Sequence, residues 1–249
     1  TFETYSPTAD TFVRSSAAGN KYGTADALEI WTSSDGTDFA GLMSFTIPEK
    51  AGSEIAKATL VLHAERVKGD RKLTIYPFGY AISEGDDTWN TQGENVKKAR
   101  EGEPIAEKVL NGQSGKAVTQ EGVTDEYKIA DAWKTEFDIT EHVASIGSGV
   151  VNLLLSHNGE NNNQNVKVYT KEVKDVTLND GVTVFKAADL CPKLVVEYTT
   201  ATGINEVATG ETAVKGKEGI YTLSGVRVAK ADRPGVYIIN GKKVLVRSK

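Results

Sequence analysis

The feature of the sequence that most constrains the fold is a succession of short runs in which apolar and polar residues alternate. In the first 200 residues these runs lie at 11–14, 27–31, 42–47, 58–64, 73–78, 150–156, 166–169 and 193–198. They are rich in β-branched and aromatic residues and are bounded by glycine, asparagine, aspartate or proline, as strands and their turns are. Their number and spacing predict an all-β fold, an antiparallel β-sandwich of the jelly-roll type.

One short helix is predicted among the strands. Thr140 is a suitable N-cap for residues 141–146, and Gly147 follows the last turn. Residues 91–133 are polar, poorly periodic and rich in glutamate, lysine and glycine. They predict a long ordered excursion from the sandwich, with short strands near 105–110.

A change of composition near residues 199–203 predicts a domain boundary. Residues 203–249 carry a net charge of +5, which leaves −10 for residues 1–202. The tail has further strand-type runs at 219–223, 226–228, 235–239 and 243–246, and Asn240-Gly241 is a strong hairpin signal. We therefore expect a sandwich domain over 1–200 and a small C-terminal β module over 201–249.

Composition disfavours several classes of protein. The net charge of −5 lacks the basic footprint of a nucleic-acid-binding protein, so no nucleic-acid partner is predicted. The absence of any apolar run of about 18 residues predicts no transmembrane segment. Cys191 is the single cysteine, which excludes an intrachain disulfide and favours a buried structural thiol.

No catalytic motif is recognisable, so the sequence favours a protein that is not an enzyme. There is no G-x-S-x-G nucleophile elbow, and the histidines are isolated from one another. The acidic residues between 84 and 94 are expected to be a solvated loop rather than a glycoside-hydrolysing pair. The alternative is a polysaccharide lyase, with His157 or Tyr169 as base and Lys171 neutralising a uronate carboxylate.

Binding of a sugar is the simpler interpretation. Tyr22 and Trp31 adjoin polar loops, where each ring would either stack on a sugar or close the edge of the core. A uronate or sulfate would also need lysine or arginine, which bind anionic oxygens. The candidate ligand-binding residues are Arg14, Lys21, Tyr22, Trp31, His157, Tyr169 and Lys171.

Calcium requires several converging oxygen ligands. Asp10, Asp35 and Asp38 are the candidate ligands of a structural Ca²⁺ ion, although the chain has no EF-hand spacing. Apart from this ion, no cofactor is predicted.

The order of the motifs resembles that of the DNRLRE-domain family over residues 5–198. The resemblance rests on ADTFVR at 9–14, NKYG at 20–23, LEI at 28–30, LMSF at 42–45, ATLVL at 58–62, TWN at 88–90, FDIT at 137–140, YTKE at 169–172 and PKLVV at 192–196. It implies a jelly-roll carbohydrate-binding module with polysaccharide as partner, acidic glycans included. It also implies that a catalytic domain can be appended to such a module.

The tail resembles another kind of domain. The runs GIYTLSGVRV at 219–228 and GVYIINGKK at 235–243 are similar to the C-terminal type IX secretion sorting domains of secreted Bacteroidetes proteins. This resemblance implies a secreted or cell-surface protein and a secretion apparatus as a further partner. The sequence thus predicts a secreted, non-catalytic polysaccharide-binding protein. A lyase and a structural or adhesin spacer module of the cell envelope are the alternatives.

Overall fold

The computed structural model describes residues 1–67, 71–110, 113–114, 134–157, 166–177, 181–182, 184–200, 219–222, 226–231, 234–240 and 242–246. The chain divides into two compact units, Thr1–Ala201 and Thr202–Lys249. Of the excursion predicted over 91–133, residues 111–112 and 115–133 lie outside the described residues.

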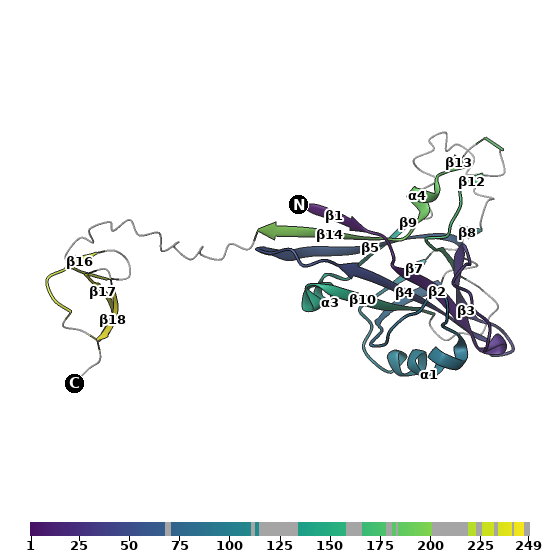
Figure 1. The fold of residues 1–249 in the computed structure, drawn as a ribbon, viewed down its shortest axis with the longest axis horizontal. Coiled ribbons are helices and arrows are strands. Elements are labelled where there is room, and N and C mark those ends of the chain that lie inside the picture. Colours follow the sequence, from purple (N-terminus) through teal and green to yellow (C-terminus); the bar gives the residue numbers. More distant parts are fainter. Residues whose placement is uncertain are drawn as a thin grey trace. The chain divides into compact units, whose positions relative to one another are not determined.

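The first unit is built mainly from strands (Figure 1). They are β1 (Phe2–Tyr5), β2 (Ala9–Arg14), β3 (Ala27–Thr32), β4 (Asp38–Ile47), β5 (Ser53–Val67), β6 (Arg71–Pro77), β7 (Ala106–Leu110), β8 (Gln113–Ser114), β9 (Lys134–Asp138), β10 (Gly149–Ser156), β11 (Val166–Tyr169), β12 (Val176–Thr177), β13 (Val184–Phe185) and β14 (Lys193–Thr200). The helical elements are η1 (Ser15–Ala17), α1 (Trp89–Arg100), α3 (Thr140–Ile146) and α4 (Ala187–Leu190). The predicted all-β sandwich is confirmed.

The strands pair antiparallel in two layers. One layer has the order β1-β14-β5-β9, and the other has the order β2-β4-β10-β6-β7. Strands β11 and β3 connect them, because β11 pairs with both β5 and β3, and β3 pairs with β4. The main core lies between the layers, where Phe45 of β4, Leu153 of β10, Leu60 of β5 and Leu194 of β14 are fully buried.

Helix α1 covers the outer face of the second layer (Figure 1). Val96 of α1 packs there with Leu42 of β4 and Leu154 of β10, whose neighbours in sequence point into the main core. This second cluster explains why three leucines follow one another at 153–155, since both faces of β10 are buried.

The sequence predicts short strands near 105–110 in the excursion, whereas the structure also places helix α1 at its start. The helix begins after Thr88, whose hydroxyl accepts from the Thr91 N–H while the Thr91 hydroxyl accepts from the Thr88 N–H. Threonine stands where a capping box usually has glutamate or glutamine, so the start signal is weak. Val96 is the one buried apolar residue of the helix, which leaves little apolar periodicity to detect.

The second helix is where the sequence predicts it, but its cap is different. The N-cap of α3 is Ile139, not Thr140. The Thr140 hydroxyl instead accepts from the Ala58 N–H at 2.9 Å, which ties the helix to β5. Gly147 ends the helix with φ of 72°, a backbone conformation that favours glycine. None of the described helices has the length and hydropathy needed to cross a bilayer.

The second unit contains a four-stranded antiparallel sheet. Its strands are β15 (Ile220–Thr222), β16 (Arg227–Val228), β17 (Gly235–Ile239) and β18 (Lys242–Val246), in the order β16-β15-β17-β18. Asn240, between β17 and β18, has φ of 49°, as the predicted hairpin requires.

Candidate functional site

The two predicted sugar-stacking residues lie in a row of aromatic rings, which we call the aromatic face: Tyr22, Phe12, Phe39 and Trp31. Tyr22 stacks on Phe12 at 4.2 Å between ring centroids, and Trp31 stacks on Phe39 at 4.5 Å. Phe12 and Phe39 are buried, whereas Tyr22 and Trp31 are half-buried at the edge of the main core. The outer two rings are therefore anchored from beneath and keep part of their surface in solvent.

A cation adjoins this row. The Arg14 guanidinium lies 5.1 Å from the centre of the Phe39 ring, and its Nε donates to the Ser16 hydroxyl at 2.9 Å. Among the residues that the structure describes, Arg14 has no carboxylate partner within ion-pair distance. Its remaining N–H donors are therefore available for an anionic oxygen.

The other predicted ligand-binding residues are engaged within the protein. Lys21 forms an exposed ion pair with Asp86 at 2.9 Å. Tyr169 is buried, with an exposed fraction of 3%. The Lys171 ammonium binds Glu84 at 2.7 Å and Glu172 at 3.2 Å.

His157 belongs to an ion-pair network that joins β4, α1 and the end of β10. Its Nε2 lies 2.9 Å from Asp38 Oδ1, and Arg100 holds the same carboxylate through two N–H groups at 2.5 and 2.9 Å. The His157 ring also contacts the hydroxyl of the buried Thr32. Burial acts to raise the pKa of Asp38, but the hydrogen bonds from His157 and Arg100 outweigh it and lower that pKa to about 2.

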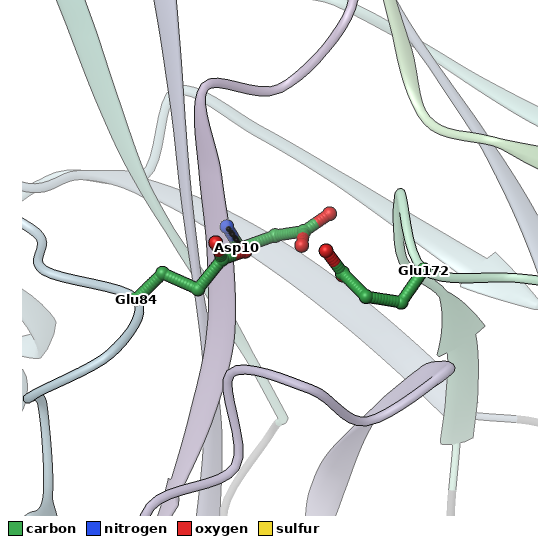
Figure 2. Close-up of side chains that lie close together, drawn as sticks. All are labelled: Asp10, Glu84 and Glu172. Atoms are coloured by element: carbon green, nitrogen blue, oxygen red, sulfur yellow. Dashed lines mark hydrogen bonds between the residues drawn. The ribbon is translucent and has the colours of Figure 1, made fainter.

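A cluster of three carboxylates lies where three distant segments meet (Figure 2). Asp10 is on β2, Glu84 is in the segment between β6 and α1, and Glu172 is in the turn after β11. One carboxylate oxygen from each residue lies within 4.8 Å of the other two. Asp10 has an exposed fraction of 0%, and its carboxyl group points toward that of Glu172 (Figure 2).

The electrostatics of this cluster are unfavourable to charge on Asp10. Burial raises the pKa of Asp10, whereas the hydrogen bond from the Lys171 N–H lowers it. The neighbouring Glu172 and Glu84 carboxylates raise it further, and the net effect is a raised pKa. Lys171 supplies the one ammonium that contacts the cluster among the described side chains, and Glu84 and Glu172 raise its pKa although burial opposes this.

The three aspartates predicted as calcium ligands are not brought together in one such cluster. Asp10 is in the carboxylate cluster, whereas Asp38 is bound by Arg100 and His157. Asp35 is in an exposed turn, where its carboxylate accepts from the Ser33 hydroxyl and from the Thr37 N–H.

Sequence reasoning missed Glu84, Glu172 and Arg100 as members of these two clusters. Glu84 precedes the helix that was not predicted, and Arg100 ends it. No signal in the sequence pointed to Glu84, although the structure explains one glycine, because a Cβ atom on Gly23 would lie 2.0 Å from the Glu84 carbonyl oxygen. Gly23 belongs to a motif that the sequence already singles out.

A shallow groove on the outer face of the first layer offers a different surface. It is lined by Phe2, Lys57, Thr59, Val61, Glu136, Val195 and Glu197. Phe2 is 69% exposed, but the lining carries more acidic than basic side chains. Its charge therefore does not favour a polyanion.

Comparison with known proteins gives one family. Residues 1–102 match the model of carbohydrate-binding module family 96. The matched segment runs from β1 through α1 and contains the aromatic face, Arg14, Asp10 and Glu84. The match supports a carbohydrate-binding module. No curated protein matches the chain.

Proposed function

We propose that this protein binds polysaccharide on the aromatic face of its first unit and does not cleave it. The observation that carries the proposal is the match of residues 1–102 to a carbohydrate-binding module family. Sugar rings present C–H groups that pack on the negative face of an aromatic ring. Tyr22 and Trp31 offer such faces, and their buried partners Phe12 and Phe39 hold them in place.

Acidic glycans are the proposed ligand class. The support is Arg14, whose guanidinium adjoins the aromatic face and has N–H donors that fit a carboxylate. The sequence as a whole is acidic, with a net charge of −5, so a uronate must be attracted locally rather than by long-range steering.

The cellular setting is part of the proposal. The resemblance of residues 219–243 to type IX sorting domains supports a secreted or cell-surface protein. The DNRLRE-like motif order of residues 5–198 supports the same class of extracellular glycan-binding module.

Affinity electrophoresis tests the function directly. Native gels containing a polyuronate, a sulfated glycan or a neutral glucan are run beside gels without polysaccharide. We expect retardation by the polyuronate and less or none by the neutral glucan. Absence of retardation by every glycan would reject the function and favour a structural spacer.

Variants then test the binding surface. Trp31→Ala should weaken the affinity for polysaccharide, measured from retardation, at least tenfold, because it removes a stacking face. Arg14→Gln should weaken it as much, because it removes a charge-assisted hydrogen bond. Lys97→Ala removes an exposed cation of α1 and serves as the control. If Lys57→Ala loses binding and Arg14→Gln does not, the glycan binds in the groove lined by Phe2 and Lys57 and not on the aromatic face. Ultraviolet absorbance from unsaturated products should not appear, since it would indicate a lyase.

A further inference from the structure

The carboxylate cluster of Asp10, Glu84 and Glu172 contains two buried oxygens whose hydrogen-bonding capacity is unused. Asp10 Oδ1 and Glu172 Oε2 are both inaccessible to solvent, and neither accepts a hydrogen bond from any residue that the structure describes. Buried polar atoms are almost always paired, because leaving one unpaired is costly. The two unpaired oxygens belong to carboxyl groups that point toward each other across the cluster (Figure 2).

The remaining oxygens are partly satisfied, which fixes the carboxylates in position. Asp10 Oδ2 accepts from the Lys171 N–H at 2.8 Å, and Glu84 Oε1 accepts from the Asp10 N–H at 3.2 Å. Glu84 is further held by the close approach of its backbone to Gly23. The cluster is therefore preorganised by β2 and by the turn after β11.

We propose that Asp10, Glu84 and Glu172 bind a Ca²⁺ ion. Calcium takes oxygen ligands at about 2.3–2.6 Å, so two oxygens on one ion are at most about 5 Å apart. The cluster meets this limit, since its three oxygens lie within 4.8 Å of one another. Magnesium prefers about 2.0–2.1 Å in strict octahedral geometry, which requires a tighter set.

The charge of the carboxylate cluster also favours a divalent cation. If all three carboxylates ionise beside the Lys171 ammonium, two negative charges remain uncompensated in a largely buried place. A divalent cation neutralises both, and the unpaired Asp10 and Glu172 oxygens become its ligands. The ion then joins β2, the segment before α1 and the turn after β11, which are far apart in the sequence.

Calcium-dependent stability of the full chain tests this proposal. The chain is stripped with a chelator, the calcium dissociation constant is measured by titration calorimetry, and unfolding is followed by tryptophan fluorescence. All three tryptophans lie at or before residue 133, so the signal reports on the first unit. At calcium about 100-fold above its dissociation constant, the Tm should rise by about 5 to 10 °C relative to chelator.

Variants of the cluster locate the ion. Asp10→Asn and Glu172→Gln should each weaken calcium binding at least tenfold and abolish most of the Tm shift. Glu94→Gln, which removes an exposed carboxylate of α1, should retain it. If Asp10→Asn does not fold, Glu172→Gln decides the question.

Two outcomes overturn the proposal. One is a Tm of the unchanged chain that is the same in calcium and in chelator. A higher Tm for Asp10→Asn would then indicate a proton shared between Asp10 and Glu172. The other is a calcium shift that both cluster variants retain. Neither outcome bears on glycan retardation, so this test and that of the proposed function fail separately.

Discussion

The two units of the chain are built from the same kind of strand, but they differ in what their sheets cover. In the first unit, two layers enclose a core in which Phe45, Leu60 and Leu153 have no exposed surface. In the second unit, none of the side chains that the structure describes is buried. Alternating strand-type runs occur in both units, so alternation predicts strands but does not predict a core. A buried core needs a second layer to cover the sheet, and a unit of fewer than 50 residues has little chain left to form one.

The largest expected effect is on the core of the first unit. Phe45→Ala should lower its free energy of unfolding by about 3 to 5 kcal/mol, because the cavity adds to the lost burial. Guanidinium unfolding followed by tryptophan fluorescence measures this. Ile238→Ala in β17, a half-buried residue of the second unit, should leave that transition unchanged. An equal shift for both variants would show that the two units unfold as one.

The pH dependence of stability should also be confined to the first unit, which holds all three histidines. Burial lowers the pKa of His63 to about 4, helped by Lys193 and Lys134. The unfolded state therefore takes up a proton first, and stability present above about pH 6.5 is lost as pH falls toward 4. The loss from His63 should be up to about 3 kcal/mol. Because the raised pKa of Asp10 acts in the opposite direction over this range, the loss is measured as the difference in pH slope between the unchanged chain and His63→Gln. Equal slopes in the two proteins would contradict it.

A smaller effect is expected from the Asp38 network. Since the pKa of Asp38 is lowered to about 2, its contribution is present above about pH 4 and is lost as pH falls toward 2. We expect Asp38→Asn to cost about 2 kcal/mol at pH 7. A double-mutant cycle with Arg100→Ala measures the coupling, and additive effects would show that the ion pair contributes nothing.

The smallest effect is expected in the second unit. Asn240 has positive φ, and its side chain accepts from the Gly219 N–H at 3.1 Å. Asn240→Ala should destabilise the β17–β18 hairpin by about 1 kcal/mol more than Asn240→Gly, since both lose the hydrogen bond but only glycine tolerates the positive φ. Amide hydrogen exchange in β17 and β18 compares the two variants. Faster exchange in Asn240→Gly than in Asn240→Ala would argue against a left-handed turn.

The strands could be predicted from the sequence because each carries its own signal of alternation, β-branching and turn residues. Helix α1 could not, since it presents Val96 alone as a buried apolar side chain and begins with an atypical cap. The three-leucine run at 153–155 contained a further clue, because a strand apolar on both faces requires a covering element. That element is α1.

The candidate site residues also differ in how far the sequence predicts them. Tyr22 and Trp31 could each be singled out as an aromatic residue beside a polar loop, but the row that joins them through Phe12 and Phe39 could not be predicted. The carboxylate cluster could be predicted only in part: Asp10 is conspicuous in its strand, but the Asp10–Glu84 contact spans 74 positions. Asp38 was an equally reasonable candidate ligand from sequence. Its pairing with Arg100 depends on where an unpredicted helix ends.

The most direct test of the central claim is a calorimetric titration of the full chain with a purified uronic-acid oligosaccharide, repeated on Trp31→Ala and Arg14→Gln. We predict measurable binding by the unchanged chain and at least tenfold weaker binding by each variant, with Lys97→Ala unaffected. Equal binding by all four proteins would place the ligand elsewhere, and no binding by the unchanged chain would contradict uronate recognition.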